Sequence, residues 1–252
     1  MAGIVSGLDA LELLKEPKAN KFENKFSSLK VGQTRTVKVI NFGDFEASHA
    51  YSIFGVVNTF IPEQAPKLSD RGYPIGDLTP FDKVWKHYKD QSQEWTDEMA
   101  QEASKYAIRP RFAIGFYDLD EKKCIVIDFS KKQAETIIKS IQTNEKRLGN
   151  RAFEITKGDR GSIQINPILP DELTDAHQQA FNEAPKEFDK SLFEDLYFVR
   201  DEKGMLEALQ QAGVDVTQFG YNAPTSAEQP SPQVAEANPF ATEDINEDDL
   251  PF

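Results

Sequence analysis

The chain has 252 residues, of which 39% are hydrophobic and 28% are charged, and its formal net charge is −13. Such a length and composition fit one substantial globular domain with appendages, or two small domains, and exclude the fibrous classes. A single cysteine excludes an internal disulfide and a multi-cysteine zinc site, and three scattered histidines have no ligand spacing. Without an apolar run of about eighteen residues or a signal-like N-terminus, we expect no membrane span, no cofactor and a cytoplasmic location.

The charge is unevenly distributed along the chain. Nine acidic residues and no Lys or Arg follow Lys203, so residues 1–203 carry only −4 of the total. Two stretches of the body, 15–38 and 101–161, are basic. They are either ordinary solvated faces or binding segments for an anionic partner, with which the acidic end would compete.

The N-terminal half alternates between predicted helices and strands. Leucines at helical spacing predict a short helix over 8–14, followed by a mobile basic arm, so that 1–30 forms one N-terminal unit. Alternating β-branched residues predict strands at 34–42 and 51–61. Helix-spaced apolar residues after a Pro-rich and Gly-rich loop predict a helical insertion at about 62–107.

Two strands and a helix are predicted next. The strands cover 108–120 and 124–129 and are joined by a charged turn, and the helix covers 131–142 with Ser130 as its N-cap. A further pair of strands is predicted within 151–168.

The C-terminal part is predicted to be helical and acidic over 171–220, with helices at 189–198 and 203–211. From 221 to 252 the chain is rich in Pro, Ser, Ala and Gln and cannot bury a core, so we expect a disordered acidic tail.

These elements predict a mainly β fold with helical additions. About five short strands with a helix after the fourth are typical of an OB-fold-like five-stranded barrel, here over residues 31–170 with its insertion. Another small barrel or an α+β sheet fits the same pattern.

The strand AIRPRFAIGFYD carries the clearest candidate binding surface. Alternation places Arg109, Arg111 and Tyr117 on one side, with the small residues Ala113 and Gly115 between them. Guanidinium groups bind phosphates, and Tyr117 or Tyr106 offers a base a flat surface, so this face is typical of single-stranded nucleic-acid binding. The alternative is a solvated strand face with a buried aromatic.

Lysines beside this strand extend the candidate surface. Lys131 and Lys132 follow the next strand and would continue a phosphate track. The group Trp85, Lys86, Tyr88 and Lys89 in the insertion is ambiguous, because aromatic residues at helical spacing more often belong to a core.

Two parts of the chain resemble known families. EDDLPF resembles the C-terminal tip of bacterial single-stranded-DNA-binding proteins, which docks on other genome-maintenance proteins. The stretch SKYAIRPRFAIGFYDLDEKKCIVIDFSKKQAETIIKSI is similar to the basic-aromatic strand, turn and helix start of the helix-destabilising proteins of T-even and related tailed phages. RAFEITKGDRGSIQI resembles the hairpin that follows in that family.

The resemblance implies a role and a set of contacts. The role is protection of single-stranded DNA in replication, recombination and repair, in the bacterial host cytoplasm if the protein is phage-encoded, with self-association along the strand. The implied DNA contacts are Lys105, Tyr106, Arg109, Arg111, Phe112, Lys131 and Lys132, although the alternation also fits a core position for Phe112. The family's Cys/His zinc insertion is not matched, because this insertion holds His87 and no cysteine.

The predicted tip has its own mechanism. Asp248 and Asp249 would steer it to a basic rim, while Leu250, Pro251 and Phe252 would fill an apolar pocket on a replication, recombination or repair protein.

Alternative functions differ in the chemistry they need. A magnesium-dependent nuclease would need Asp118, Asp120 and Asp128 to converge, whereas we expect turn residues and no enzyme, since no Walker loop or HExxH motif is present. A recombination mediator or interaction protein would carry the same tip without DNA affinity.

Overall fold

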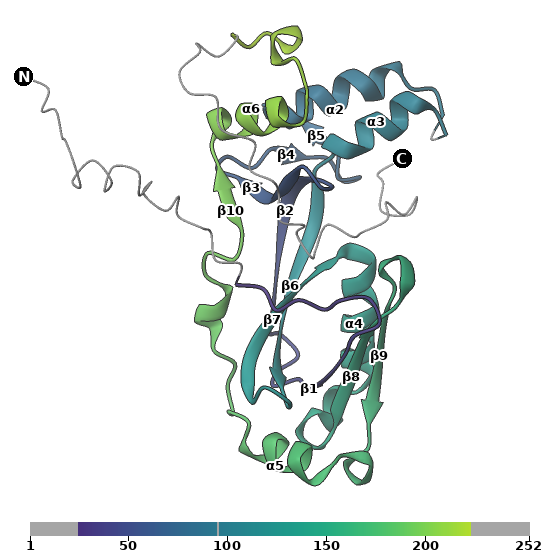
Figure 1. Cartoon of the computed structure of the whole chain (residues 1–252), viewed down its shortest axis with the longest axis vertical. Helices are drawn as coiled ribbons and strands as arrows, with labels where there is room; N and C mark the ends of the chain where they lie inside the picture. Colours follow the sequence, from purple (N-terminus) through teal and green to yellow (C-terminus); the bar gives the residue numbers. More distant parts are fainter. Residues whose placement is uncertain (1–24, 95, 223–252) are drawn as a thin grey trace, which may run out of the picture.

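The computed structural model describes residues 25–94 and 96–222. The predicted N-terminal helix and the acidic tail with its tip lie outside the described residues. Figure 1 shows a molecule in which α2, α3 and α6 gather at one end of the long axis and α4, β8, β9 and α5 at the other, with the long strands β2 and β6 between them.

One large mixed sheet organises the chain. Its strands are β1 (Thr34–Lys38), β2 (Phe45–Ile53), β3 (Val57–Pro62), β6 (Arg109–Asp118), β7 (Lys123–Ser130), β8 (Ala152–Lys157), β9 (Ile163–Ile168) and β10 (Phe198–Arg200). A separate small hairpin is formed by β4 (Lys67–Leu68) and β5 (Pro74–Ile75).

Helices lie between and after the strands. The α-helices are α2 (Pro80–Gln91), α3 (Glu98–Tyr106), α4 (Lys131–Thr143), α5 (Asp175–Glu183) and α6 (Glu202–Gln211). The short 3-10 helices are η2 (Glu145–Asn150), η3 (Asp159–Gly161), η4 (Pro170–Glu172), η5 (Lys190–Phe193) and η6 (Val216–Phe219).

Strand β6 is the centre of the sheet. It pairs with β7 along one edge, and its other edge is shared by β2 near Arg109 and by β1 near Asp118. Strand β1 also pairs antiparallel with β8, which forms a hairpin with β9. The sheet remains open and the barrel is not closed, because β7 and β9 do not pair within the described residues. The prediction of a mainly β fold with helical additions is confirmed at that level.

The two faces of β6 are covered differently. We call the side bearing Ile108, Phe112, Ile114 and Phe116 the helix face, because α4 covers its lower part and α2 and α3 cover its upper part. The opposite side, bearing Arg111, Ala113, Gly115 and Tyr117, we call the strap face.

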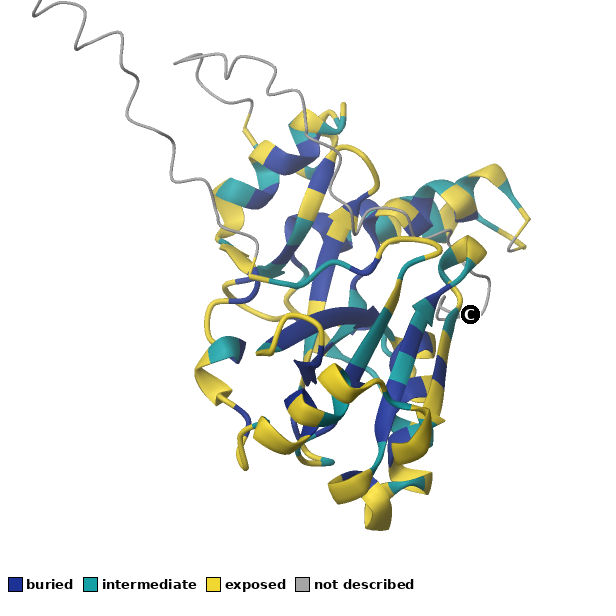
Figure 2. Ribbon diagram, turned by 60° about the horizontal axis from the view of Figure 1, so that its bottom comes forward, coloured by how far each residue is buried: buried dark blue, intermediate teal, exposed yellow. Residues whose placement is uncertain are grey.

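The strap face takes its name from residues 184–197, the strap. Phe188, Phe193, Leu196 and Tyr197 of the strap pack on Ala113 and Val126. The strap leads from α5 at one end of the molecule toward β10 at the other (Figure 1). Figure 2 shows the buried strands beneath helices and loops whose outer sides are exposed.

Several predicted elements change in length or kind. The predicted strand 51–61 is a hairpin of β2 and β3 that turns at Phe54, because Gly55 adopts a φ of 69°. The predicted helix at 189–198 is wrong: it is a single 3-10 turn followed by β10.

The end of the predicted mobile arm is fixed in place. Leu29 is buried, and the Ser27 amide donates to the Val126 carbonyl at 2.8 Å. Residues 25–30 therefore belong to the folded core.

Candidate nucleic-acid interface

The first turn of α4 presents two exposed lysines, Lys131 and Lys132. Ser130 is the N-cap, as predicted, and its hydroxyl accepts from the Gln133 amide. Gln133 completes a capping box, because its side chain accepts from the Ser130 amide at 3.0 Å. The lysines are therefore held on a well-capped helix start.

Lysines in the first turn of α4 destabilise the helix. The positive end of the helix dipole disfavours each cation in the first turn by roughly 0.3–1 kcal/mol, and acidic residues are preferred there. The first turn of α4 contains no acidic residue. A local cost of this kind is typical of a site that binds an anion, since the dipole and both lysines then attract the same group.

A second element joins this helix start. The side-chain amide of Gln133 donates to the Gly161 carbonyl at 2.5 Å, which fixes the tip of the β8–β9 hairpin against α4. Arg160 at that tip is exposed and has a left-handed φ of 54°. We call Lys131, Lys132 and Arg160 the basic cluster.

The surrounding segment is also basic. Residues 131–160 contain eight Lys or Arg and four Asp or Glu, against a chain that is acidic overall. Repulsion from the acidic residues of the whole chain is therefore locally reduced around the basic cluster.

Arg111 does not share this surface. Its guanidinium forms a two-pronged ion pair with Asp128 on the strap face, at 3.2 Å from Nε to Oδ1 and 2.7 Å from Nη2 to Oδ2. The Tyr197 hydroxyl donates to the same carboxylate at 2.8 Å, and burial raises the pKa of Tyr197. The expectation that Arg111 faces an open phosphate track is wrong, because its partners are internal.

Arg109 is partly buried and donates to the Ser104 carbonyl at 2.6 Å. It lies on the same side of β6 as Arg111, two residues away. Both arginines are partly buried and bonded within the protein, whereas Lys131 is exposed, so the three do not form one open cationic surface.

The small residues Ala113 and Gly115 on the strap face accommodate side chains of the strap. A Cβ added at Gly115 would lie 2.6 Å from Cζ of Phe188, so the glycine accommodates that ring. Ala113 is 1% exposed and Tyr117 is 7% exposed. Both are covered by the chain, so this part of the face is not the open surface that the alternation predicted.

Tyr106 is also in the core. Its ring stacks on Tyr88 with centroids 5.9 Å apart, and its hydroxyl donates to Glu102 at 3.0 Å. Burial raises the pKa of Tyr106. Its neighbour Lys105 is exposed at the end of α3 and pairs with Glu102.

Phe112 is the predicted aromatic that stays partly accessible. It lies on the helix face, packs at the border of the α4 core and is only partly buried. The alternative reading of Phe112 as a core residue is therefore supported by its packing, and DNA contact by Phe112 stays a prediction.

The aromatics of the insertion are mainly structural. Trp85 stacks on Tyr73 with centroids 5.8 Å apart, and Lys86 pairs with Asp90 on the helix surface. Among the described residues, no group of three or more His, Cys, Asp or Glu side chains is arranged to hold a metal ion.

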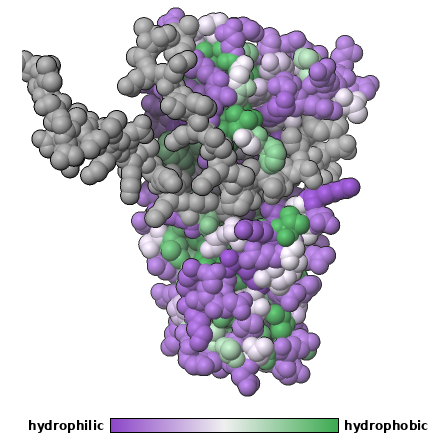
Figure 3. All heavy atoms as spheres, in the orientation of Figure 1, coloured by the Kyte–Doolittle hydropathy of each residue, from purple (hydrophilic) through white to green (hydrophobic). Residues whose placement is uncertain are grey.

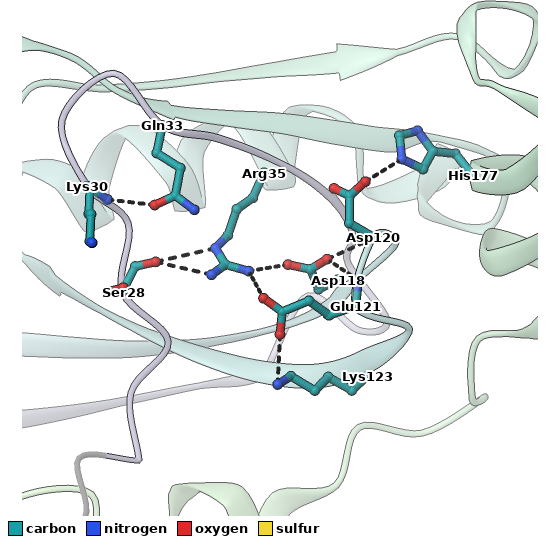
Figure 4. A network of polar contacts seen from close by, with 9 residues as sticks. All are labelled: Ser28, Lys30, Gln33, Arg35, Asp118, Asp120, Glu121, Lys123 and His177. Atoms are coloured by element: carbon teal, nitrogen blue, oxygen red, sulfur yellow. Dashed lines mark hydrogen bonds and ion pairs between the residues drawn. The ribbon is translucent and has the colours of Figure 1, made fainter.

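The three aspartates of the nuclease alternative do not converge, because Asp128 lies apart from the other two. Asp128 lies opposite Ala113, five residues along β6 from Asp118, a distance of about 16 Å. Asp118 instead pairs with Arg35 and accepts the backbone amides of Asp120 and Glu121, which shapes the β6–β7 turn (Figure 4).

The same network connects other elements to this turn. Arg35 also binds Glu121 at 2.9 Å, and His177 of α5 contacts Asp120 at 2.8 Å. Hydrogen bonds from Lys123 and Arg35 lower the pKa of Glu121. Asp118 and Asp120 therefore shape the β6–β7 turn, as predicted, whereas the prediction of a turn is wrong for Asp128, which lies within β7.

The sequence patterns missed Arg160 and Gln133. Arg160 follows Asp159 in a turn of the hairpin, where a single charge has no periodic signal. Gln133 lies three residues after Ser130, and this spacing matches a capping box, so the sequence does indicate its role at the helix start. Its contact with Gly161, 28 residues away, has no local signal.

The face of the molecule seen in Figure 3 is mostly hydrophilic, with small separate apolar patches. None of the described helices is both long and apolar enough to cross a membrane. No protein-family model matches the chain, and the comparison with curated proteins found no significant match.

Proposed function

We propose that this chain is a sequence-tolerant single-stranded-DNA-binding protein whose basic cluster binds the phosphates of the strand. The observation that carries the proposal is the pairing of two first-turn lysines with a hairpin-tip arginine, held together by the hydrogen bond from Gln133 to Gly161. Three cations around one helix start attract a chain of phosphates, and exposed lysines bind without reading base identity.

The strand connections support an OB-type core. In that core, β1, β6, β7, β8 and β9 would be the five strands, with α4 between the third and the fourth. The pairing of β1 with both β6 and β8 fits this connectivity. Elements β2 to α3 would then be an insertion between the first two strands.

The nuclease alternative has no comparable support, because Asp118 and Asp128 are each paired with a different arginine. Recruitment of replication, recombination or repair proteins through Asp248 to Phe252 remains a proposal that rests on the sequence of the tip. Protection of DNA and self-association along the strand depend on the same binding.

The test is fluorescence anisotropy with a labelled oligothymidine strand and a duplex of equal length. We expect the wild-type chain to prefer the single strand and to lose affinity as salt rises. Replacing Lys131 and Lys132 with alanine should weaken binding and reduce the salt slope by about 1.4, since each lost contact with a single strand contributes about 0.7.

The control is the double variant Lys67→Ala and Lys203→Ala, which removes two exposed lysines from β4 and α6. It changes the net charge equally and should leave the salt slope near the wild-type value. Equal binding of duplex and single strand, or no binding of either, would reject the proposed function.

A further inference from the structure

Part of the helix face is left uncovered between the two groups of helices. Ala47 and His49 of β2 are exposed, and Pro110 and Phe112 of β6 are only partly buried. In the register of the two strands His49 lies opposite Pro110, and Ala47 lies opposite Phe112. We call these four residues the open strip.

The same face is closed on both sides of the open strip. Toward α2 and α3, Tyr51 is 1% exposed and Ile108 is 5% exposed. Toward α4, Ile114 is 3% exposed and Phe116 is fully buried. The covered residues Ile108 and Ile114 are six residues apart, so the uncovered stretch of β6 lies within about 20 Å of strand.

The open strip borders the basic cluster. Ser130 at the end of β7 lies opposite Arg111 of β6, which is the neighbour of Pro110 and Phe112, and Lys131 follows Ser130 as the first residue of α4. The four positions of the open strip include no acidic residue. The open strip therefore lies next to the basic cluster. It carries the aromatic rings of His49 and Phe112 and the smaller side chains of Ala47 and Pro110.

We propose that the open strip is the base-binding platform of the protein, with His49 and Phe112 stacking against bases of a single strand whose phosphates lie on the basic cluster. This inference rests on the proposed function and adds His49 as a contact. Flat rings beside a row of cations are the features that bind bases without sequence preference. Ala47 leaves space for the bases to approach.

His49 acts through its ring. Partial desolvation of the imidazole lowers the pKa of His49, so the ring is neutral at neutral pH and contributes stacking instead of charge. Its loss should therefore reduce affinity without changing the salt slope. This behaviour differs from that of Lys131 and Lys132.

The experiment measures oligothymidine binding by anisotropy at several salt concentrations. His49→Ala should weaken binding about 10-fold with an unchanged salt slope, and His49→Tyr should restore most of the affinity. Ala47→Glu, which places a carboxylate on the open strip, should weaken binding at least as much.

The matched control is Ser52→Glu. Ser52 is exposed on the same strand but lies between the buried residues Tyr51 and Ile53, so it points to the opposite side. The affinity of the Ser52→Glu variant for oligothymidine should stay within about 2-fold of the wild type. Thermal unfolding verifies that each variant is folded.

The outcomes separate the two proposals. A wild-type chain that does not bind the oligonucleotide rejects the proposed function. Binding that is weakened by the Lys131 and Lys132 substitutions, but unchanged in His49→Ala and Ala47→Glu, overturns the open strip alone. An equal loss of affinity in Ser52→Glu and Ala47→Glu would also overturn the open strip, because the loss would then not depend on which face of β2 carries the new carboxylate.

Discussion

Arg111 illustrates how a single side chain takes a structural role in place of a binding role. Its side chain is 12% exposed and that of Asp128 is 3% exposed, so the ion pair is largely removed from water. Such a pair adds little net stability, but removal of one partner leaves a buried charge uncompensated. Arg111 therefore fixes the strap through Asp128 and Tyr197.

Replacing Arg111 with methionine should destabilise the fold by about 3–5 kcal/mol, because Asp128 would keep its buried charge without a counterion. The free energy of unfolding in urea measures this loss. Adding Asp128→Leu should recover part of the stability, since the pair is then replaced by apolar side chains.

DNA affinity provides the second measurement on the same variants. The folded fraction of the double variant should bind oligothymidine as the wild type does. A reduced salt slope in that variant would contradict the structural role and return Arg111 to the DNA-binding surface.

At the residue scale, the sequence indicated which side chains are charged or aromatic and on which side of a strand they lie. It did not indicate which other residues they contact. Lys131 and Lys132 were predicted to be exposed cations and are exposed. Alternation placed Arg111 and Tyr117 on one side of the strand, and they do lie on one side. Whether that side is open depended on Phe188 and Tyr197, which arrive from about 70 residues later in the chain and leave no local signal.

At the scale of elements, the candidate interface depends on the contact between helix α4 and the β8–β9 hairpin. Helix α4 begins at its capping box, and the β8–β9 hairpin reaches it through the hydrogen bond from Gln133 to Gly161. Gln133 is 8% exposed, so it acts as a positioning residue and is not a contact with a ligand. This amide therefore helps to hold the hairpin tip that carries Arg160 against the start of α4.

Gln133→Ala should lower the stability by about 1–2 kcal/mol, because it removes the reciprocal cap and leaves the Gly161 carbonyl without this donor. It should also weaken oligothymidine binding several-fold, although residue 133 does not touch DNA. Amide hydrogen exchange should increase at the hairpin tip.

The matched control is Gln142→Ala, at an exposed position near the end of the same helix. It should change neither binding nor exchange at the tip. Unchanged DNA affinity in a destabilised Gln133→Ala variant would show that the hairpin tip takes no part in binding.

Elements with strong local patterns were predicted well. The helix at 131–142 and its Ser130 cap match α4, and the predicted strands at 108–120 and 124–129 match β6 and β7 within two residues. The hairpin within 51–61 was missed, because apolar residues continue through the turn at Phe54 and mask the break. The strand at 198–200 exists only through pairing with β3, which no local pattern predicts.

At the scale of the whole molecule, the two groups of helices cover the two ends of one helix face and leave the open strip between them. On the other face, the strap covers Ala113, Gly115 and Val126. The open strip is the part of the helix face on which we propose that a ligand binds. The basic cluster lies at the border of the open strip, because α4 begins where β7 ends.

Ultraviolet crosslinking of bound oligothymidine to the wild-type chain, read by mass spectrometry, tests this central claim most directly. We predict crosslinked peptides from β2, from the first half of β6, from the start of α4 and from the β8–β9 hairpin tip. Crosslinks confined to the strap or α5 would contradict the account, because the DNA would then lie on the other side of the sheet.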